Sequence, residues 1–174
     1  LEQVIEYVQD LKFDKEQIDY LRSTGIFTEP FLEYLSTVRF TGDLWSVPEG
    51  TPVFPYEPLV RVKAPLIEAQ LVETARLLAL NHQTLIATKA RRIVQSAEGR
   101  TVMEFGARRA HNFDSAVYGA RAAYIAGVDG TATTQAGMAF GIPALGTMAH
   151  SFVQSYPTEY DAFLAYAKAF PDSF

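Results

Sequence analysis

The sequence has no cysteine, no long uncharged apolar run and no excess of basic residues, and these absences exclude several classes of protein. Without cysteine there are no disulfides and no thiolate chemistry, although cytosolic proteins can simply lack this residue. No apolar run approaches the roughly 20 residues that span a bilayer, and we find no signal-peptide pattern. The net charge of −5 argues against a surface devoted to nucleic acid. We therefore expect a soluble cytoplasmic protein that binds neither nucleic acid nor membranes.

Apolar residues, by contrast, make up 48% of the 174 positions, so the chain can bury a sizeable core. Positive charges gather between Lys89 and Arg109, whereas the first sixty residues are predominantly acidic. A local basic cluster can bind a small anion even where the whole chain is acidic. The sequence opens on Leu1 in mid-pattern and closes on an aromatic-rich segment, so we expect a piece of a longer protein.

The N-terminal part is predicted to be helical, and a stretch that is interrupted by prolines and glycines follows it. Apolar spacing predicts two short helices within residues 2–24, with Asp14 as an N-cap and Gly25 as a stop signal, and a third helix over 29–37. Between residues 40 and 63, prolines and glycines interrupt short β-prone pieces, which predicts a small section of edge or hairpin strands.

A long helical pattern follows, and then an alternation of strand and helix. The 3.6-residue apolar stripe over 68–97 predicts one long helix or two collinear ones. From residue 99 the pattern is strand then helix, repeated, which indicates βα units and a parallel sheet or barrel. We therefore divide the chain into an N-terminal α/β region, residues 1–98, and the start of a barrel domain, residues 99–174. A few βα units cannot close a barrel of about eight strands.

Ligands of such folds bind in the loops at the C-terminal ends of the strands. Arg108 and Arg109 follow the strand "TVMEF", where an arginine fork can pair with a carboxylate or phosphate, although a plain surface pair fits equally. Phe105 fits a core position or a ring that stacks on a planar ligand. His150, after "GTMA", can transfer a proton or attack phosphorus, or it can be a hydrogen-bonded structural residue.

The remaining candidates carry less specific signals. Thr131 and its neighbours in "GTATT" are expected to cap a helix first and to contact a ligand second. His82 is expected to pack within the long helix, and His111 to cap or orient the helix after "GARRA". No trio of His, Asp or Glu has the spacing of metal ligands.

Three segments, in this order and spacing, resemble the nicotinate phosphoribosyltransferase family: "EAQLVETARLLALNHQTLIATKARRI", "EFGARRAHNFDSA" and "GIPALGTMAHSFVQSYPTEYDAF". The resemblance covers nearly the whole chain, and the last two segments are its specific part. It implies a type II phosphoribosyltransferase fold, in which an N-terminal α/β domain is followed by an irregular α/β barrel. It also implies an enzyme of NAD salvage that joins nicotinate to phosphoribosyl pyrophosphate and couples this step to ATP hydrolysis.

The resemblance further implies roles for individual residues. His150 matches the family histidine that ATP phosphorylates, Arg108 matches the position at the carboxylate side of the pyridine ring, and Phe105 matches the ring that stacks on it. Arg109, Thr131 and Ser151 are the neighbouring substrate-binding candidates. Mg²⁺ and ATP would take part as co-substrates, without a tightly bound organic cofactor, and the enzyme would be a homodimer or a larger oligomer.

Family members are roughly twice as long as this chain or longer, so we expect the isolated chain to be inactive. Two alternatives stay open. A related enzyme that uses nicotinamide or quinolinate would keep the architecture, but the loop after Gly130 holds no acid to meet an amide, which favours a carboxylate substrate. The other alternative is a non-catalytic module, or one half of a split enzyme.

Overall fold

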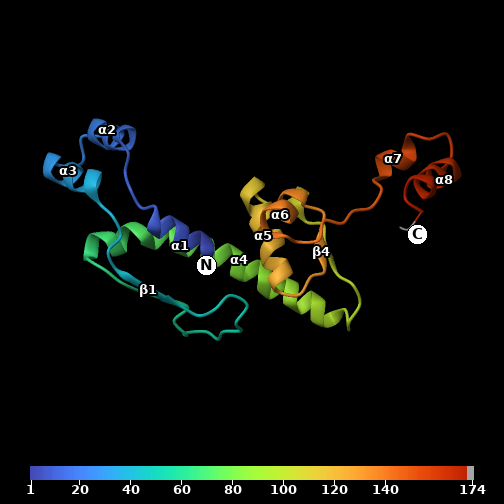
Figure 1. Ribbon diagram of the computed structural model, residues 1–174, viewed down its shortest axis with the longest axis horizontal. Coiled ribbons are helices and arrows are strands. Elements are labelled where there is room, and N and C mark those ends of the chain that lie inside the picture. Colours follow the sequence, from blue (N-terminus) through green and yellow to red (C-terminus); the bar gives the residue numbers. More distant parts are fainter. Residues whose placement is uncertain (172–174) are drawn as a thin grey trace.

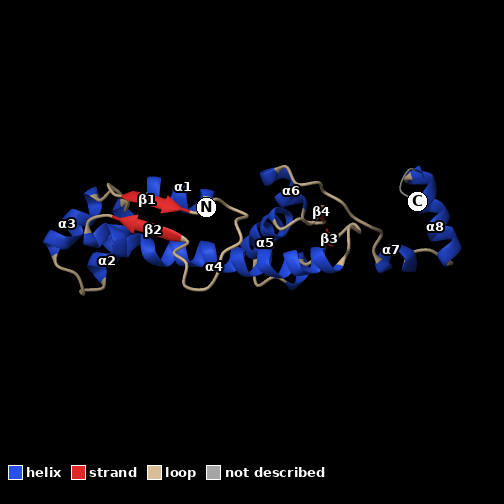
Figure 2. Ribbon diagram, turned by 90° about the horizontal axis from the view of Figure 1, so that it is seen from below, coloured by secondary structure: helices blue, strands red, loops and turns tan. Residues whose placement is uncertain are grey.

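A computed structural model describes residues 1–171 of the chain, so the last three residues of the expected barrel region lie outside the described part. The molecule is elongated, and one long helix, α4, forms its axis (Figure 1). Three helices and a β-hairpin lie along the first half of α4, and the βα units lie along its second half. A pair of short helices at the C-terminal end stands apart from both, and both views agree on this arrangement (Figure 2).

The three N-terminal helices are α1 (Glu2–Gln9), α2 (Lys15–Ser23) and α3 (Glu29–Thr37), as the apolar spacing predicts. Asp14 caps α2 in a reciprocal capping box with Gln17. Gly25 follows α2 with a φ of 68°, the left-handed conformation that stops a helix and that glycine adopts without strain. Helices α2 and α3 pack through a small apolar cluster, Ile18, Leu32 and Leu35.

The strand section is one antiparallel hairpin of β1 (Asp43–Ser46) and β2 (Val60–Lys63), which confirms the expected small strand region. Its side chains alternate, because successive residues of a strand point to opposite faces. Leu44 and Val62 face inward, where they meet a cluster contributed by α1 and α4. Residues 47–59, which include the prolines, form the connection between the strands.

Helix α4 (Leu66–Ser96) is a single helix of 31 residues, which decides between one long helix and two collinear ones. Val72 is buried in the N-terminal core, and Ala90 is buried against the βα units, so α4 links the two regions. Leu78 and Leu85 are 69% and 63% exposed, so the stripe predicted the helix but not the burial of all its members. No helix within residues 1–171 combines the length and the hydropathy that crossing a membrane requires.

The βα units consist of β3 (Met103–Glu104), the 3₁₀ turn η1 (Ala107–Arg109), α5 (Phe113–Ile125), β4 (Gly130–Thr131) and α6 (Thr134–Phe140). Strands β3 and β4 pair in parallel, with Glu104 opposite Thr131, and Thr131 forms a further parallel bridge to Ala144. The predicted alternation of strand and helix is thereby confirmed, and within residues 1–171 the strands form no closed barrel. Of the two roles expected for His111, capping was wrong, because the Asn112 side chain caps α5 by accepting the Ser115 N–H; the orienting role stays a prediction.

The last two helices, α7 (His150–Gln154) and α8 (Glu159–Ala169), pack on each other. Phe152 contacts Tyr156 and Tyr166 through ring pairs with centroids 5.1 and 6.2 Å apart. Thr158 caps α8 by accepting the Asp161 N–H. Residues 141–149 connect this helix pair to the rest of the molecule.

Candidate functional site

The candidate residues of the first βα unit gather at the C-terminal ends of β3 and β4. Phe105 directly follows β3, Arg108 and Arg109 belong to η1, and Thr131 ends β4. The side chain of Phe105 is 39% exposed, so the interpretation as a core residue was wrong. Its ring is therefore accessible to a planar ligand at the strand ends.

Arg108 and Arg109 both have exposed side chains in η1. Within residues 1–171, neither guanidinium group has a hydrogen-bond or ion-pair partner, unlike Arg22 and Arg121, which pair with carboxylates. Two unpaired guanidinium groups in the turn that follows an exposed aromatic residue suit a small aromatic anion, because arginine forms strong, directed hydrogen bonds with carboxylates and phosphates.

Glu104 is a residue of this edge that sequence reasoning missed. Its carboxylate accepts hydrogen bonds from the Gly106 N–H and from the Thr131 hydroxyl, the latter at 2.6 Å. Its own carbonyl accepts the Ala132 N–H at 3.0 Å. The available signal was an acid in the otherwise apolar strand "TVMEF", one residue before the stretch that carries the binding candidates.

Thr131 is completely buried, and its hydroxyl is engaged within the protein. It donates to Glu104 and accepts the Thr133 N–H at 3.0 Å. The Thr133 hydroxyl is buried without a partner among the described residues, and it does not cap α6, although capping was the expected role of these threonines. The substrate contact of Thr131 stays a prediction.

His150 and Ser151 are the first residues of α7, and both are exposed. The imidazole of His150 has no hydrogen-bond partner among residues 1–171. In both views α7 stands apart from β4 and α6 (Figures 1 and 2), and it packs on α8. Among residues 1–171 no hydrogen bond joins His150 to Arg108.

Metal ligands are not grouped anywhere in the described part of the chain. Residues 1–171 contain no cluster of three His, Cys, Asp or Glu side chains that could hold an ion.

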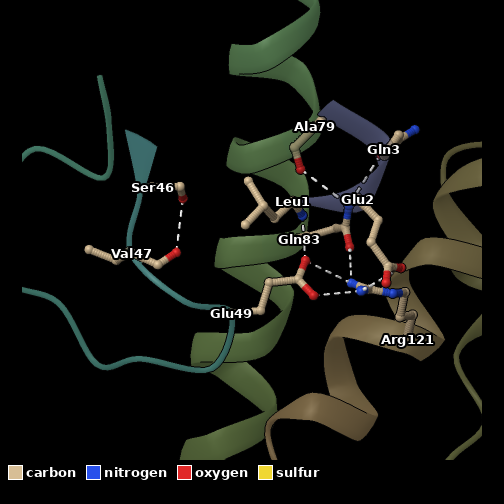
Figure 3. A network of polar contacts seen from close by, with 9 residues as sticks. All are labelled: Leu1, Glu2, Gln3, Ser46, Val47, Glu49, Ala79, Gln83 and Arg121. Atoms are coloured by element: carbon tan, nitrogen blue, oxygen red, sulfur yellow. Dashed lines mark hydrogen bonds and ion pairs between the residues drawn. The ribbon is translucent and has the colours of Figure 1, made fainter. Parts of the chain in front are cut away.

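A second polar network joins the hairpin connection to α4 and α5 (Figure 3). Arg121 donates to both carboxylate oxygens of Glu49, at 3.1 and 2.6 Å, and to Gln83 at 3.2 Å. The hydrogen bond from Arg121 is the main reason that the pKa of Glu49 is lowered to about 2. The guanidinium of Arg121 also lies 5.5 Å from the ring centre of Phe140. This network links the two regions of the molecule.

The fold and the edge together define an α/β protein with two exposed, unpaired arginines just beyond the C-terminal end of a parallel strand. Family models agree with this class and narrow it. The nicotinate phosphoribosyltransferase N-terminal domain matches residues 1–81, and the nicotinate phosphoribosyltransferase family matches residues 101–169. The chain belongs to the nicotinate phosphoribosyltransferase family.

Individual relatives show the same likeness. A nicotinate phosphoribosyltransferase of Mycobacterium tuberculosis, pncB2, is 50% identical over 98% of this chain and 37% of its own length. The Bacillus subtilis nicotinate phosphoribosyltransferase is 49% identical over 99% of this chain and 35% of its own. The crystal structure of human nicotinic acid phosphoribosyltransferase superposes with a TM-score of 0.87 at 26% identity, covering 98% of this chain and 44% of that one. The chain thus spans little more than a third of the length of these curated relatives.

Proposed function

We propose that this chain is part of a nicotinate phosphoribosyltransferase of NAD salvage, which forms nicotinate mononucleotide and pyrophosphate from nicotinate and phosphoribosyl pyrophosphate. The observation that carries the proposal is that the exposed ring of Phe105 and the unpaired guanidinium of Arg108 lie three residues apart in the segment that leaves the C-terminal end of a parallel strand. The names of the relatives support the same substrate.

Nicotinate is planar and singly negative at neutral pH, so it needs an aromatic face and a bidentate donor. Arg108 would bind the carboxylate, and Phe105 would stack on the pyridine ring. The ring nitrogen then attacks C1 of the ribose, the bond from C1 to the pyrophosphate oxygen breaks, and pyrophosphate leaves with the bonding electrons. This reaction needs orientation more than acid–base catalysis. Arg109, Thr131 and Ser151 are proposed as further contacts of the substrates.

ATP coupling is the second part of the proposal, and the exposed, unpartnered imidazole of His150 supports it. An imidazole nitrogen attacks the γ-phosphorus of ATP, ADP leaves, and water later hydrolyses the phosphohistidine to phosphate. Mg²⁺ would enter with ATP as part of the substrate. A homodimeric or larger assembly, a cytoplasmic location and the inactivity of the isolated chain stay predictions.

The test is Arg108→Ala in the complete protein, with nicotinate and ATP affinities measured by calorimetry. Loss of a charged hydrogen-bond donor should weaken nicotinate binding about 10- to 100-fold, with ATP binding nearly unchanged. Arg100→Ala is the matched control, because Arg100 is an exposed arginine with its own partner, Glu98. Equal losses of nicotinate and ATP affinity would reject this role for Arg108, and wild-type protein that binds no nicotinate would reject the proposed function.

A further inference from the structure

Glu104 ends β3, at the strand ends where the proposed substrate-binding residues gather. Its carboxylate forms hydrogen bonds with groups of the protein. One oxygen, Oε1, accepts the N–H of Gly106, and the other, Oε2, accepts the hydroxyl of Thr131. Gly106 belongs to the segment between Phe105 and Arg108, whereas Thr131 ends the neighbouring strand. A single carboxylate therefore ties together the two loops that carry the binding candidates.

We propose that Glu104 is a positioning residue for nicotinate: it fixes the turn that presents Phe105 and Arg108 against the end of β4. This inference rests on the proposed function, because it concerns how the same substrate is held. Glu104 contacts no substrate atom in this role and acts through the two groups that it binds.

The close approach of Gly106 to Glu104 supports the role. A Cβ atom at position 106 would lie 2.8 Å from Oε1 of Glu104, closer than real Cβ contacts, so a side chain there would displace the carboxylate. The backbone leaves β3 at this point, and Gly106 is the residue directly before η1, where its carbonyl accepts the Arg109 N–H. The direction in which Phe105 and Arg108 project depends on that turn.

The other half of the link reaches the β4 loop through buried groups. The Thr131 hydroxyl is completely buried, and it also accepts the Thr133 N–H, so Glu104 is linked to Thr133 through Thr131. The carbonyl of Glu104 accepts the Ala132 N–H in addition. The loop that contains the unpartnered Thr133 hydroxyl is thereby held in one place relative to Phe105.

The opposite end of the same strand pair offers a control. There the Asp129 carboxylate accepts the Val102 N–H at 2.7 Å, so it also joins the two chain segments, but at the N-terminal ends of β3 and β4, two residues before Thr131 and Glu104. Glu104→Gln and Asp129→Asn each remove one negative charge without changing the side-chain shape. A glutamine side chain has one acceptor oxygen and one NH₂ donor, so its NH₂ group must face either the Gly106 N–H or the Thr131 hydroxyl.

The experiment measures steady-state kinetics of both variants in the complete protein, with nicotinate and phosphoribosyl pyrophosphate varied separately. We expect Glu104→Gln to raise KM for nicotinate roughly tenfold or more, with KM for phosphoribosyl pyrophosphate and the phosphorylation of His150 within about twofold of wild type. Asp129→Asn should leave KM for nicotinate unchanged. An equal rise in both variants, or no rise in Glu104→Gln, would overturn the proposal.

Two further measurements separate this inference from the proposed function. Thr131→Val should raise KM for nicotinate as Glu104→Gln does, and Thr131→Ser, which keeps the hydroxyl, should restore most of the loss. Amide hydrogen exchange without ligand should be faster at Gly106 and Thr133 in Glu104→Gln than in Asp129→Asn. Unchanged exchange would overturn the positioning role, whereas faster exchange in a protein that does not use nicotinate would reject the proposed function and leave the loop geometry standing.

Discussion

The hairpin region and the β3–β4 edge both contain charged side chains, but they use them in opposite ways. In the N-terminal region two carboxylates are paired across elements: Glu49 binds Arg121 on α5, and the buried Glu68 on α4 accepts the Thr41 N–H at 2.6 Å. At the strand edge the exposed Arg108 and the adjacent Arg109 have no such partner among residues 1–171.

This difference separates charges that stabilise the fold from charges that are available to a ligand. A buried or half-buried charge is costly unless it is hydrogen-bonded, so Glu68 and Glu49 contribute to stability through their partners. An exposed charge costs little and holds its place only weakly, so Arg108 depends on a neighbour such as Glu104 to aim it. Substitutions should therefore divide into those that change stability and those that change binding.

The largest expected effect is the loss of a reaction with a ligand, the ATP-dependent phosphorylation of His150. His150→Ala in the complete protein should abolish the ATP-dependent phosphate, measured by intact mass and peptide mapping, because the nucleophilic nitrogen is removed. The melting temperature should stay within about 1 °C, because an exposed side chain with no partner contributes little.

His111→Ala is the control for this experiment, because His111 is also exposed and lies outside α7. Its substitution should leave the phosphate in place. A phosphate that persists in His150→Ala, or that disappears in both variants, would contradict the assignment of His150.

The next effect in size concerns stability. The carboxylate of Glu68 is only 5% exposed and accepts both the N–H and the hydroxyl of Thr41. Glu68→Ala leaves the Thr41 N–H without this acceptor and should cost about 2 kcal/mol of unfolding free energy, measured by urea denaturation.

Glu73→Ala is the matched control on the same helix, because Glu73 is exposed. We expect a change below about 0.5 kcal/mol there. Similar costs for the two substitutions would remove the distinction between paired and unpaired carboxylates.

Local patterns predicted most of the elements, because the physics that fixes them is local. The Asp14 cap, the Gly25 stop and the strand–helix alternation after residue 99 depend on neighbours a few positions away. Burial along α4 could not be predicted in the same way. The apolar stripe contains both the buried Ala90 and the exposed Leu85, and only the packing of other elements decides between them.

The site was predictable in its position but not in its internal contacts. Chain order placed Arg108 beyond a strand end, and the parallel pairing of β3 and β4 makes that the end at which such folds bind their ligands. The link between Glu104 and Thr131, however, joins residues 27 positions apart, and it depends on the register of β3 against β4. No local pattern contains that register, which is why Glu104 was missed and Thr131 was taken for a capping residue.

The smallest expected effect concerns the ion pair between Glu49 and Arg121, and it is tested by measuring stability as a function of pH. Arg121 holds the pKa of Glu49 at about 2, below the ordinary value of 4.5. A carboxyl group with a lowered pKa stabilises the folded state above its unfolded pKa, and this contribution disappears as the pH falls from about 4.5 toward 2. Melting temperatures of wild type and Glu49→Gln should therefore differ most near neutral pH and converge across that interval.

Glu6→Gln on α1 is the control for this titration, because Glu6 is an exposed glutamate without an ion-pair partner among residues 1–171. Its melting temperature should follow that of the wild type at every pH. A constant gap between wild type and Glu49→Gln down to pH 2 would mean that the carboxylate charge does not stabilise the junction, and that shape and neutral hydrogen bonds hold the hairpin connection to α5. In that case the contrast between the two regions would concern exposure alone and not the pairing of charge.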